Sequence, residues 1–163
     1  MKSIKLRQIA MDDFPDVHKW SKDATFCKAN GWQLNQEDKE LFQWWSNCVQ
    51  NTSDTFLRMG IEYEAKLIGY VDVACIKENS AELGIAIGDS TLWGKGLGSR
   101  AALLMIKFAS EKLGIIMFDA ETHEGNVRSR KMLEKLRFKE ISRTGKEVYL
   151  GEESRLIQYQ LTL

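Results

Sequence analysis

The chain has 163 residues, of which 44% are hydrophobic and 28% charged, which suits one globular domain over residues 1–163 with a sizeable core. Lysine plus arginine number 23, as do aspartate plus glutamate, and this balance argues against a dedicated binder of nucleic acid or of an anionic membrane. No apolar run approaches the roughly 20 residues that span a bilayer, and three isolated cysteines form no metal-ligand pairs, so we expect a cytoplasmic protein without a metal.

The first third of the chain predicts one strand and two helices. The alternation in "SIKLRQIA" is typical of a strand. The segment "DDFPDVHKWSKD" predicts a helix start, with Asp12 or Asp13 as the cap and Pro15 in the first turn. A second helix is expected over "NQEDKELFQWWSNCVQN", with Asn35 as its cap and an apolar face.

The middle of the chain predicts strands followed by alternating helices and strands. "TFLRMGIEY" and "KLIGYVDVACI" flank a short polar turn and indicate a hairpin, and "AELGIAIG" adds a third strand. A helix is expected over 98–113, ended by Gly114, then a buried strand "IIMFDAET" and a helix over 126–136. The remaining residues predict a long hairpin or two strands, which gives a mixed α/β fold around one sheet.

The loop "WGKGLG", at 93–98, places glycines at alternate positions directly before a helix. Such glycines expose backbone N–H groups, and at a helix N-terminus these groups form an anion site, so we expect phosphate there. A P-loop is excluded because Lys95 is followed by Gly96. A dinucleotide fingerprint is formally met by Gly96, Gly98 and Ala101, but "DSTLW" separates this loop from the preceding strand.

Two longer segments carry a more specific resemblance. "AELGIAIGDSTLWGKGLGSRAALLMIKFA" and the downstream "FDAETHEGNVRSRKMLEKLRFKEI" resemble the acetyl-coenzyme A (acetyl-CoA) site of the GNAT N-acetyltransferases, nearest to the branch of ribosomal-protein N-terminal acetyltransferases. The resemblance covers about 82–142. It implies a central, mostly antiparallel sheet with splayed fourth and fifth strands and about four flanking helices.

The resemblance also implies the cofactor contacts. Backbone N–H groups of the loop would hold the pyrophosphate, and the loop residues concerned are Trp93, Gly94, Lys95, Gly96, Leu97, Gly98 and Ser99. Trp93 stands where the family has arginine or glutamine. The strand residues Ile85, Ala86 and Ile87 would pair with the pantetheine amides. Asn126 matches an asparagine that contacts the cofactor arm, and it also suits a helix N-cap.

Acetyl transfer from a thioester to an amine needs a base, an oxyanion donor and a proton for the thiolate. Glu82 is the first candidate for the base, because the small residues that follow on its strand face leave room beside it. Asp72 on the neighbouring strand and His123 are the alternative bases. If Glu82 has no catalytic role, we expect it to be an exposed or ion-paired residue of the strand. A backbone N–H near Ile87 would serve the oxyanion.

The proton donor departs from the common pattern of the family. Leu133 occupies the place of the tyrosine that many members use, seven residues after the asparagine. By resemblance to the nearest branch, Ser129 is the substitute, and its spacing from Met132, Leu133 and Leu136 places it on the inward helix stripe. The basic residues of this helix either meet the 3′-phosphate of CoA or form an exposed face; they are Arg128, Arg130, Lys131 and Lys135.

The sequence thus predicts an acetyl-CoA-dependent N-acetyltransferase that is a monomer or homodimer. The acceptor would be a primary amine, either a protein N-terminus or a small amine such as a polyamine or aminoglycoside. Five aromatic residues would line its site or belong to the core: Trp20, Phe26, Trp32, Trp44 and Trp45. The alternatives are a non-catalytic acyl-CoA sensor, which the absent tyrosine favours, and a dinucleotide-binding protein.

Overall fold

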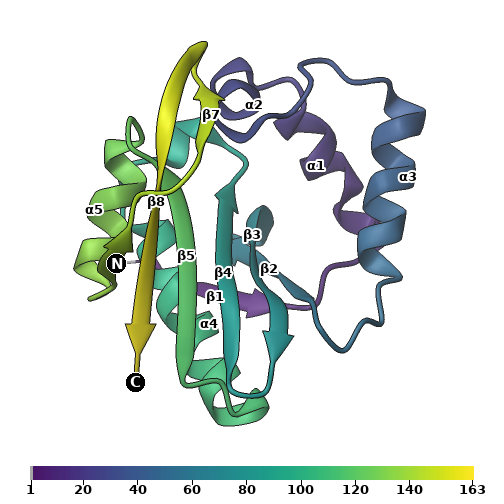
Figure 1. Ribbon diagram of the computed structural model, residues 1–163. Coiled ribbons are helices and arrows are strands. Elements are labelled where there is room, and N and C mark those ends of the chain that lie inside the picture. The colour runs from purple at the N-terminus through teal and green to yellow at the C-terminus, as the bar shows by residue number, and fades with distance from the viewer. Residues whose placement is uncertain (1) are drawn as a thin grey trace.

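A computed structural model describes residues 2–163 as one open sheet flanked by helices on both faces (Figure 1). The eight strands are β1 (Ile4–Arg7), β2 (Leu57–Tyr63), β3 (Lys66–Lys77), β4 (Ser80–Ile87), β5 (Met117–His123), β6 (Lys139–Ser142), β7 (Lys146–Tyr149) and β8 (Glu152–Thr162). The helices are α1 (Phe14–Trp20), α2 (Ala24–Asn30), α3 (Asp38–Val49), α4 (Leu97–Leu113) and α5 (Val127–Lys135), with short 3-10 turns η1 (Met11–Asp13) and η2 (Ser90–Leu92).

The strand order β1-β2-β3-β4-β5-β8-β6 follows from how each strand is connected. Short turns join β2 to β3 and β3 to β4, so these neighbours are antiparallel. In the first turn Glu64 and Ala65 both have positive φ (50° and 64°), as a two-residue hairpin turn requires. Only β4 and β5 are parallel, because α4 crosses between them. The predicted mixed α/β class is confirmed.

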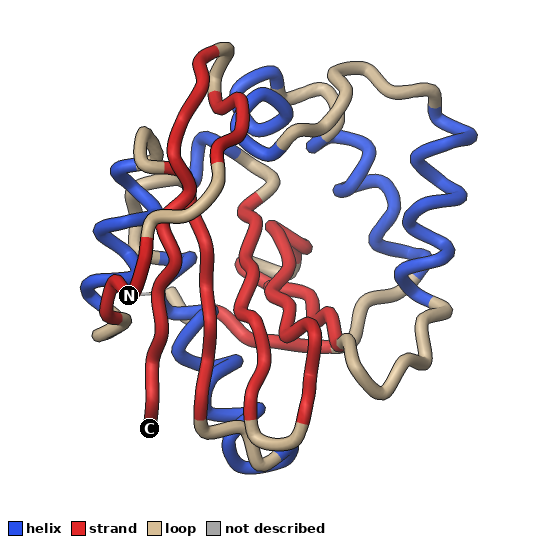
Figure 2. The backbone as a smooth tube through the Cα atoms, viewed as in Figure 1, coloured by secondary structure: helices blue, strands red, loops and turns tan. Residues whose placement is uncertain are grey.

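Two hydrophobic clusters lie on the two faces of the sheet. One face packs against α4 and α5 and includes Met105, Phe118, Leu133 and Tyr159. The other packs against α1 to α3 and is rich in aromatic residues, among them Trp20, Phe26 and Trp45. Figure 2 shows the two groups of helices on opposite sides of the strands. No helix within residues 2–163 is long and apolar enough to cross a membrane.

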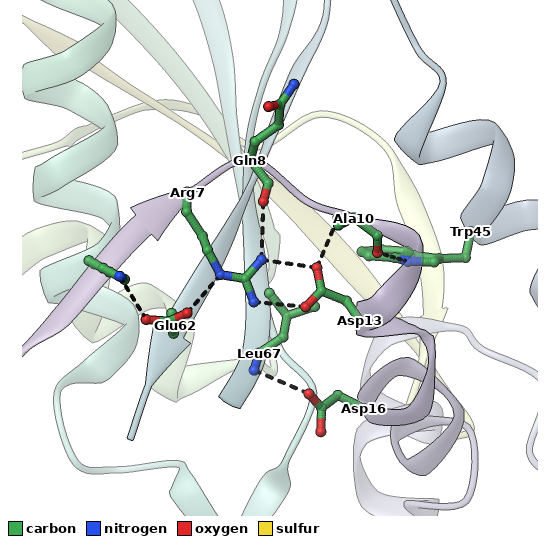
Figure 3. A network of polar contacts seen from close by, with 9 residues as sticks. Arg7, Gln8, Ala10, Asp13, Asp16, Trp45, Glu62 and Leu67 are labelled. Atoms are coloured by element: carbon green, nitrogen blue, oxygen red, sulfur yellow. Dashed lines mark hydrogen bonds and ion pairs between the residues drawn. The ribbon is translucent and has the colours of Figure 1, made fainter. Parts of the chain in front are cut away.

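A polar network fixes the N-terminal helices to the edge of the sheet (Figure 3). The guanidinium of Arg7 donates to both carboxylate oxygens of Asp13, at 3.0 and 2.7 Å, and to Glu62 at 2.9 Å. These hydrogen bonds raise the pKa of Arg7, and those that it donates to Asp13 do so most strongly. Trp45 donates its indole N–H to the carbonyl of Ala10 at 3.0 Å. The network holds α1 and α3 in a set position over β2 and β3.

Three details differ from the sequence-based expectation. The structure has five helices where about four were expected, because α2 was not predicted. Asn35 does not cap α3: its φ is 55°, its N–H donates to the carbonyl of Ser21, and the helix begins three residues later. The last segment forms three strands rather than two, and β7 pairs only with β8.

Replacing Gly88 with alanine is expected to destabilise the fold by about 2–3 kcal/mol, within the usual range for overpacking a core. A Cβ on Gly88 would lie 2.1 Å from the ring of Trp20, which is itself only 3% exposed. The measurement is chemical denaturation. Gly125→Ala is the matched control, because its Cβ would meet nothing closer than 3.5 Å. Equal stability of the two variants would contradict the close packing of Trp20 on this strand.

Candidate active site

The sheet opens between its two parallel strands. β4 and β5 pair at three positions, ending with Glu82 opposite Asp119. Beyond that pair β4 continues to Ile87 and β5 continues to His123, but the two strands no longer pair with each other. Figure 2 shows the two strands diverging toward the end where α4 begins. A gap of this kind leaves backbone hydrogen-bonding groups on the strand edges free for a ligand.

The alternating hydrogen bonds between β3 and β4 determine which backbone groups of β4 face the gap. The N–H of Gly88 donates to the carbonyl of Ile68 on β3 at 2.7 Å. Because successive residues alternate in direction, the backbone polar groups of Ile87 and Ile85 face away from β3 and into the gap. An extended ligand with amide groups can therefore pair with β4 as a further strand would.

The glycine loop lies at the open end of this gap and continues into α4. Gly94 and Gly96 have φ of 80° and 77°, values that residues with a side chain adopt only with strain. Gly96 is the N-cap of α4 and no side chain caps this helix end. The first N–H groups of α4 therefore have no acceptor within the helix, and the helix dipole makes this end positive.

Two contacts hold the glycine loop in place. The indole N–H of Trp93 donates to the carbonyl of Ile87 at 2.9 Å, which ties the loop to β4. Asp23, the N-cap of α2, accepts from the N–H groups of Phe26 and Ser90 at 3.0 and 2.9 Å. Burial disfavours the charge of Asp23, but these backbone hydrogen bonds outweigh it and lower the pKa of the carboxyl. Trp93 thus ties the loop itself to β4, and Asp23 ties the preceding turn η2 to α2.

A cavity of about 300 Å³ lies between the loop, β4 and α5. Its lining residues are Ala29, Asn30, Ile85, Ala86, Ile87, Leu92, Trp93, Gly94, Gly96, Leu97, Gly98, Ser99, Asn126, Arg128, Ser129, Lys131, Met132 and Lys135. The charged members are all basic, although the chain as a whole has no net charge. Basic side chains and two helix N-termini around one cavity favour an anionic ligand.

Most residues predicted to hold a cofactor line this cavity. Ten of the eleven do so; the exception is Lys95, whose side chain is exposed and is not part of the lining. Ser129 also lines the cavity. Glu82 does not: it lies three residues before Ile85, the nearest lining residue of β4, about 10 Å away at ~3.3 Å per residue. Glu82 instead marks the point where β4 and β5 separate.

The start of α5 brings Asn126 and Ser129 to the cavity wall. The side-chain oxygen of Asn126 accepts from the backbone N–H of Ser129 at 3.1 Å, so this asparagine is the N-cap of α5. Its amide group remains available to a ligand, since one side chain can cap a helix and still donate. Leu133 is 3% exposed and packs in the core, so it is not part of the cavity.

Carboxylates gather on the face of the sheet where the two strands separate. Glu82 and Asp119 are opposite each other in a parallel register, so their side chains share a face. Glu82 is exposed, and no cation lies within ion-pair distance of it among the described residues. Asp119 accepts from Gln160 at 3.0 Å. No set of three potential metal ligands occurs within residues 2–163.

Asp72 lies near this face but is engaged by an arginine. Arg58 donates to its two oxygens at 2.7 and 2.8 Å, and both side chains are 14% exposed. Burial opposes the charge of Arg58, yet the hydrogen bonds and charge of Asp72 outweigh it and raise the pKa of Arg58. The ring of Tyr70 covers the guanidinium at 4.0 Å. Both carboxylate oxygens of Asp72 are therefore already engaged by Arg58.

The remaining sequence candidates divide between core and surface. Trp20 and Trp45 are buried in the aromatic cluster, whereas Trp32 and Trp44 are half-buried and meet edge to face, with ring centroids 5.1 Å apart and an interplanar angle of 77°. His123 stacks on Tyr149 at 4.7 Å and lies 2.8 Å from Glu147 of β7, outside the cavity. The positions of Asp119 beside Glu82 and of Arg58 beside Asp72 could not be predicted from the sequence, because only strand register reveals their neighbours.

Comparison with known proteins gives one family and several similar structures. The acetyltransferase (GNAT) domain family matches residues 3–139. An uncharacterized protein of Methanocaldococcus jannaschii is 28% identical over 152 residues, which are 91% of this chain and 31% of that protein. The chain spans less than two thirds of the length of the curated relatives that it matches.

Two solved structures illustrate the agreement in fold. A ribosomal L7/L12 alpha-N-protein acetyltransferase in complex with CoA is 15% identical, with a TM-score of 0.86, and the alignment covers 100% of this chain and 96% of that one. Spermidine N-acetyltransferase from Vibrio cholerae, in complex with CoA and spermine, is 18% identical with a TM-score of 0.81, covering 98% and 95%. At these identities the likeness concerns the fold.

Proposed function

The chain belongs to the GNAT acetyltransferase family, and from this premise we propose that it transfers the acetyl group of acetyl-CoA to a primary amine. The observation that carries the proposal is the basic cavity at the N-terminus of α4, which continues into the gap between β4 and β5. CoA has the matching chemistry, since its phosphates are anionic and its pantetheine arm is extended and contains two amides.

Binding would follow the parts of the cavity. The backbone N–H groups of the glycine loop would receive the pyrophosphate, and the backbone groups of Ile85 and Ile87 that face the gap would pair with the pantetheine arm. The amide of Asn126 would contact the same arm from the α5 side. This direction places the thioester at the inner end of the gap, toward Glu82 and away from the phosphates.

The transfer needs a base that accepts the proton of the amine. It also needs hydrogen-bond donors for two anions, the oxyanion formed at the carbonyl and the thiolate of CoA. The amine nitrogen attacks the carbonyl carbon, and the proton that it loses passes to Glu82 through a water molecule. A backbone N–H of Ile85 or Ile87 donates to the carbonyl oxygen as it becomes negative. The C–S bond then breaks, Ser129 donates a hydrogen bond to the departing thiolate, and the thiolate becomes the CoA thiol by taking up the proton that the amine released.

The acceptor is proposed to approach from the face that bears Glu82 and Asp119. An amine is cationic at neutral pH, and the cofactor cavity is basic, so the two substrates favour opposite sides of β4. Protein N-terminal amines and small amines such as spermidine or aminoglycosides both fit this requirement. The half-buried Trp32 and Trp44 are proposed as the aromatic side of the same acceptor region.

The proposal is tested by following thiol release from acetyl-CoA with a panel of N-terminal peptides, polyamines and aminoglycosides. We expect thiol release with at least one amine, together with the acetylated amide in the mass spectrum of that acceptor. Tight CoA binding without release on any acceptor would overturn catalysis and favour the acyl-CoA sensor. Thermal stabilisation by NAD and none by CoA would overturn the assignment of the cavity.

A further inference from the structure

One arginine of α5 reaches across the mouth of the cavity to the glycine loop. The Cζ atom of Arg128 lies 3.7 Å from the ring centroid of Trp93. Trp93 in turn donates to the carbonyl of Ile87, so a continuous set of contacts joins α5, the loop and β4. The stack places the guanidinium over the residue that precedes Gly94, and Arg128, Gly94 and Gly96 all line the same cavity.

The charge of Arg128 has no acidic partner. Among residues 2–163 no carboxylate lies within ion-pair distance of this guanidinium. Burial lowers the pKa of Arg128, an effect that the nearby Tyr149 hydroxyl only partly offsets. Arg128 remains exposed at the edge of the cavity, and an exposed guanidinium without a counter-ion is free to bind an anion from solution.

Stacking on the indole leaves the hydrogen-bonding edge of the guanidinium free. A cation over an aromatic ring uses one face of the planar group, whereas its N–H donors lie in the plane. The edge of Arg128 therefore stays available to a second ligand while the side chain remains in place. Lysine lacks this geometry, because its ammonium is a point charge on a flexible stem.

We propose that Arg128, held against Trp93, binds the diphosphate of acetyl-CoA from the α5 side of the cavity. Trp93 is then a positioning residue for this arginine. The inference rests on the proposed function of the cavity. The diphosphate is favoured over the 3′-phosphate because Arg128 stacks on the residue that precedes Gly94, whereas Lys131 and Lys135 line the cavity one and two turns further along α5.

The arrangement makes Arg128 a specificity residue for thioesters that contain the diphosphate. Acetyl-CoA and acetyl-dephospho-CoA both contain it, and S-acetylpantetheine lacks every phosphate. The arginine contributes to binding of the first two and not of the third. Trp93 contributes through Arg128, so replacing either residue removes most of the same binding energy.

The test measures dissociation constants by calorimetry for CoA, dephospho-CoA and pantetheine with six proteins. These are the wild type, Arg128→Gln, Arg128→Lys, Trp93→Leu, the double variant of Arg128→Gln and Trp93→Leu, and the control Lys107→Gln, which removes an exposed charge on α4 outside the cavity. We expect Arg128→Gln to weaken CoA and dephospho-CoA about tenfold, the usual size of a charge-assisted contact. Pantetheine binding should not change, Arg128→Lys should recover little, and Lys107→Gln should resemble wild type.

Three outcomes would overturn the inference: no effect of Arg128→Gln, an effect on CoA but not on dephospho-CoA, or an equal effect on pantetheine. The second would assign Arg128 to the 3′-phosphate and the third would make its role structural. Adding Arg128→Gln to Trp93→Leu should cost much less than the same change in wild type, and full additivity would remove the positioning role of Trp93. Because binding is measured without an acceptor, failure of acetyl transfer leaves this result intact and contradicts only the proposed function.

Discussion

Gly96→Glu is expected to weaken CoA binding by about 100-fold or more, because two like charges 4 Å apart repel by about 4 kcal/mol at an effective dielectric constant near 20. Gly96 is the N-cap of α4 and lines the cavity, and a Cβ there would meet no atom within 4 Å. The new side chain therefore fits, but its carboxylate occupies the position proposed for phosphate. Calorimetric titration with CoA measures the loss.

The fold should tolerate this substitution, which keeps the result interpretable. A side chain at φ +77° costs roughly 1–2 kcal/mol of backbone strain, and a carboxylate at a helix N-terminus returns part of that. Gly96→Ala is the matched control because it has the same strain and no charge. If Gly96→Glu bound CoA as well as Gly96→Ala does, the glycine loop would not be the phosphate site.

The parts of the site that are local in sequence could be predicted from it. The glycines at 94, 96 and 98, the helix that follows and the cap at Asn126 each depend on residues a few positions apart. Local backbone geometry follows from such neighbours through φ requirements and helix capping. The same logic applied to Asp23 and Gly31, which begin and end α2 as its caps, would have revealed the missed helix.

The parts that depend on strand register could not be predicted in this way. Asp119 becomes a neighbour of Glu82 only through parallel pairing across the α4 crossover. Asp72 is engaged by Arg58 from the adjacent strand, and Arg128 reaches Trp93 from a helix 35 residues later in the chain. Asn35 resembled a cap, but its hydrogen bond to Ser21 serves a turn instead. Each of these contacts follows from tertiary packing, which overrides local propensity.

Glu82→Gln is expected to lower kcat/KM by about 100-fold near neutral pH, within the range for loss of a general base. Glu82 is exposed at the point where β4 and β5 separate, and the substitution keeps its size while removing its basicity. The effect should be largest at low pH, where nearly all of the acceptor amine is protonated and needs a base. At high pH more of the amine is already neutral, so the two enzymes should converge.

Asp119→Asn is the matched control for this prediction, because it removes a neighbouring charge from the same face without removing the proposed base. Its kcat/KM should fall less than that of Glu82→Gln, and its pH profile should keep the wild-type shape. An unchanged profile in Glu82→Gln would show that a water chain or another group accepts the proton. Asp72→Asn is not a clean comparison, since it leaves Arg58 buried without a counter-ion and would destabilise the fold by about 3–5 kcal/mol.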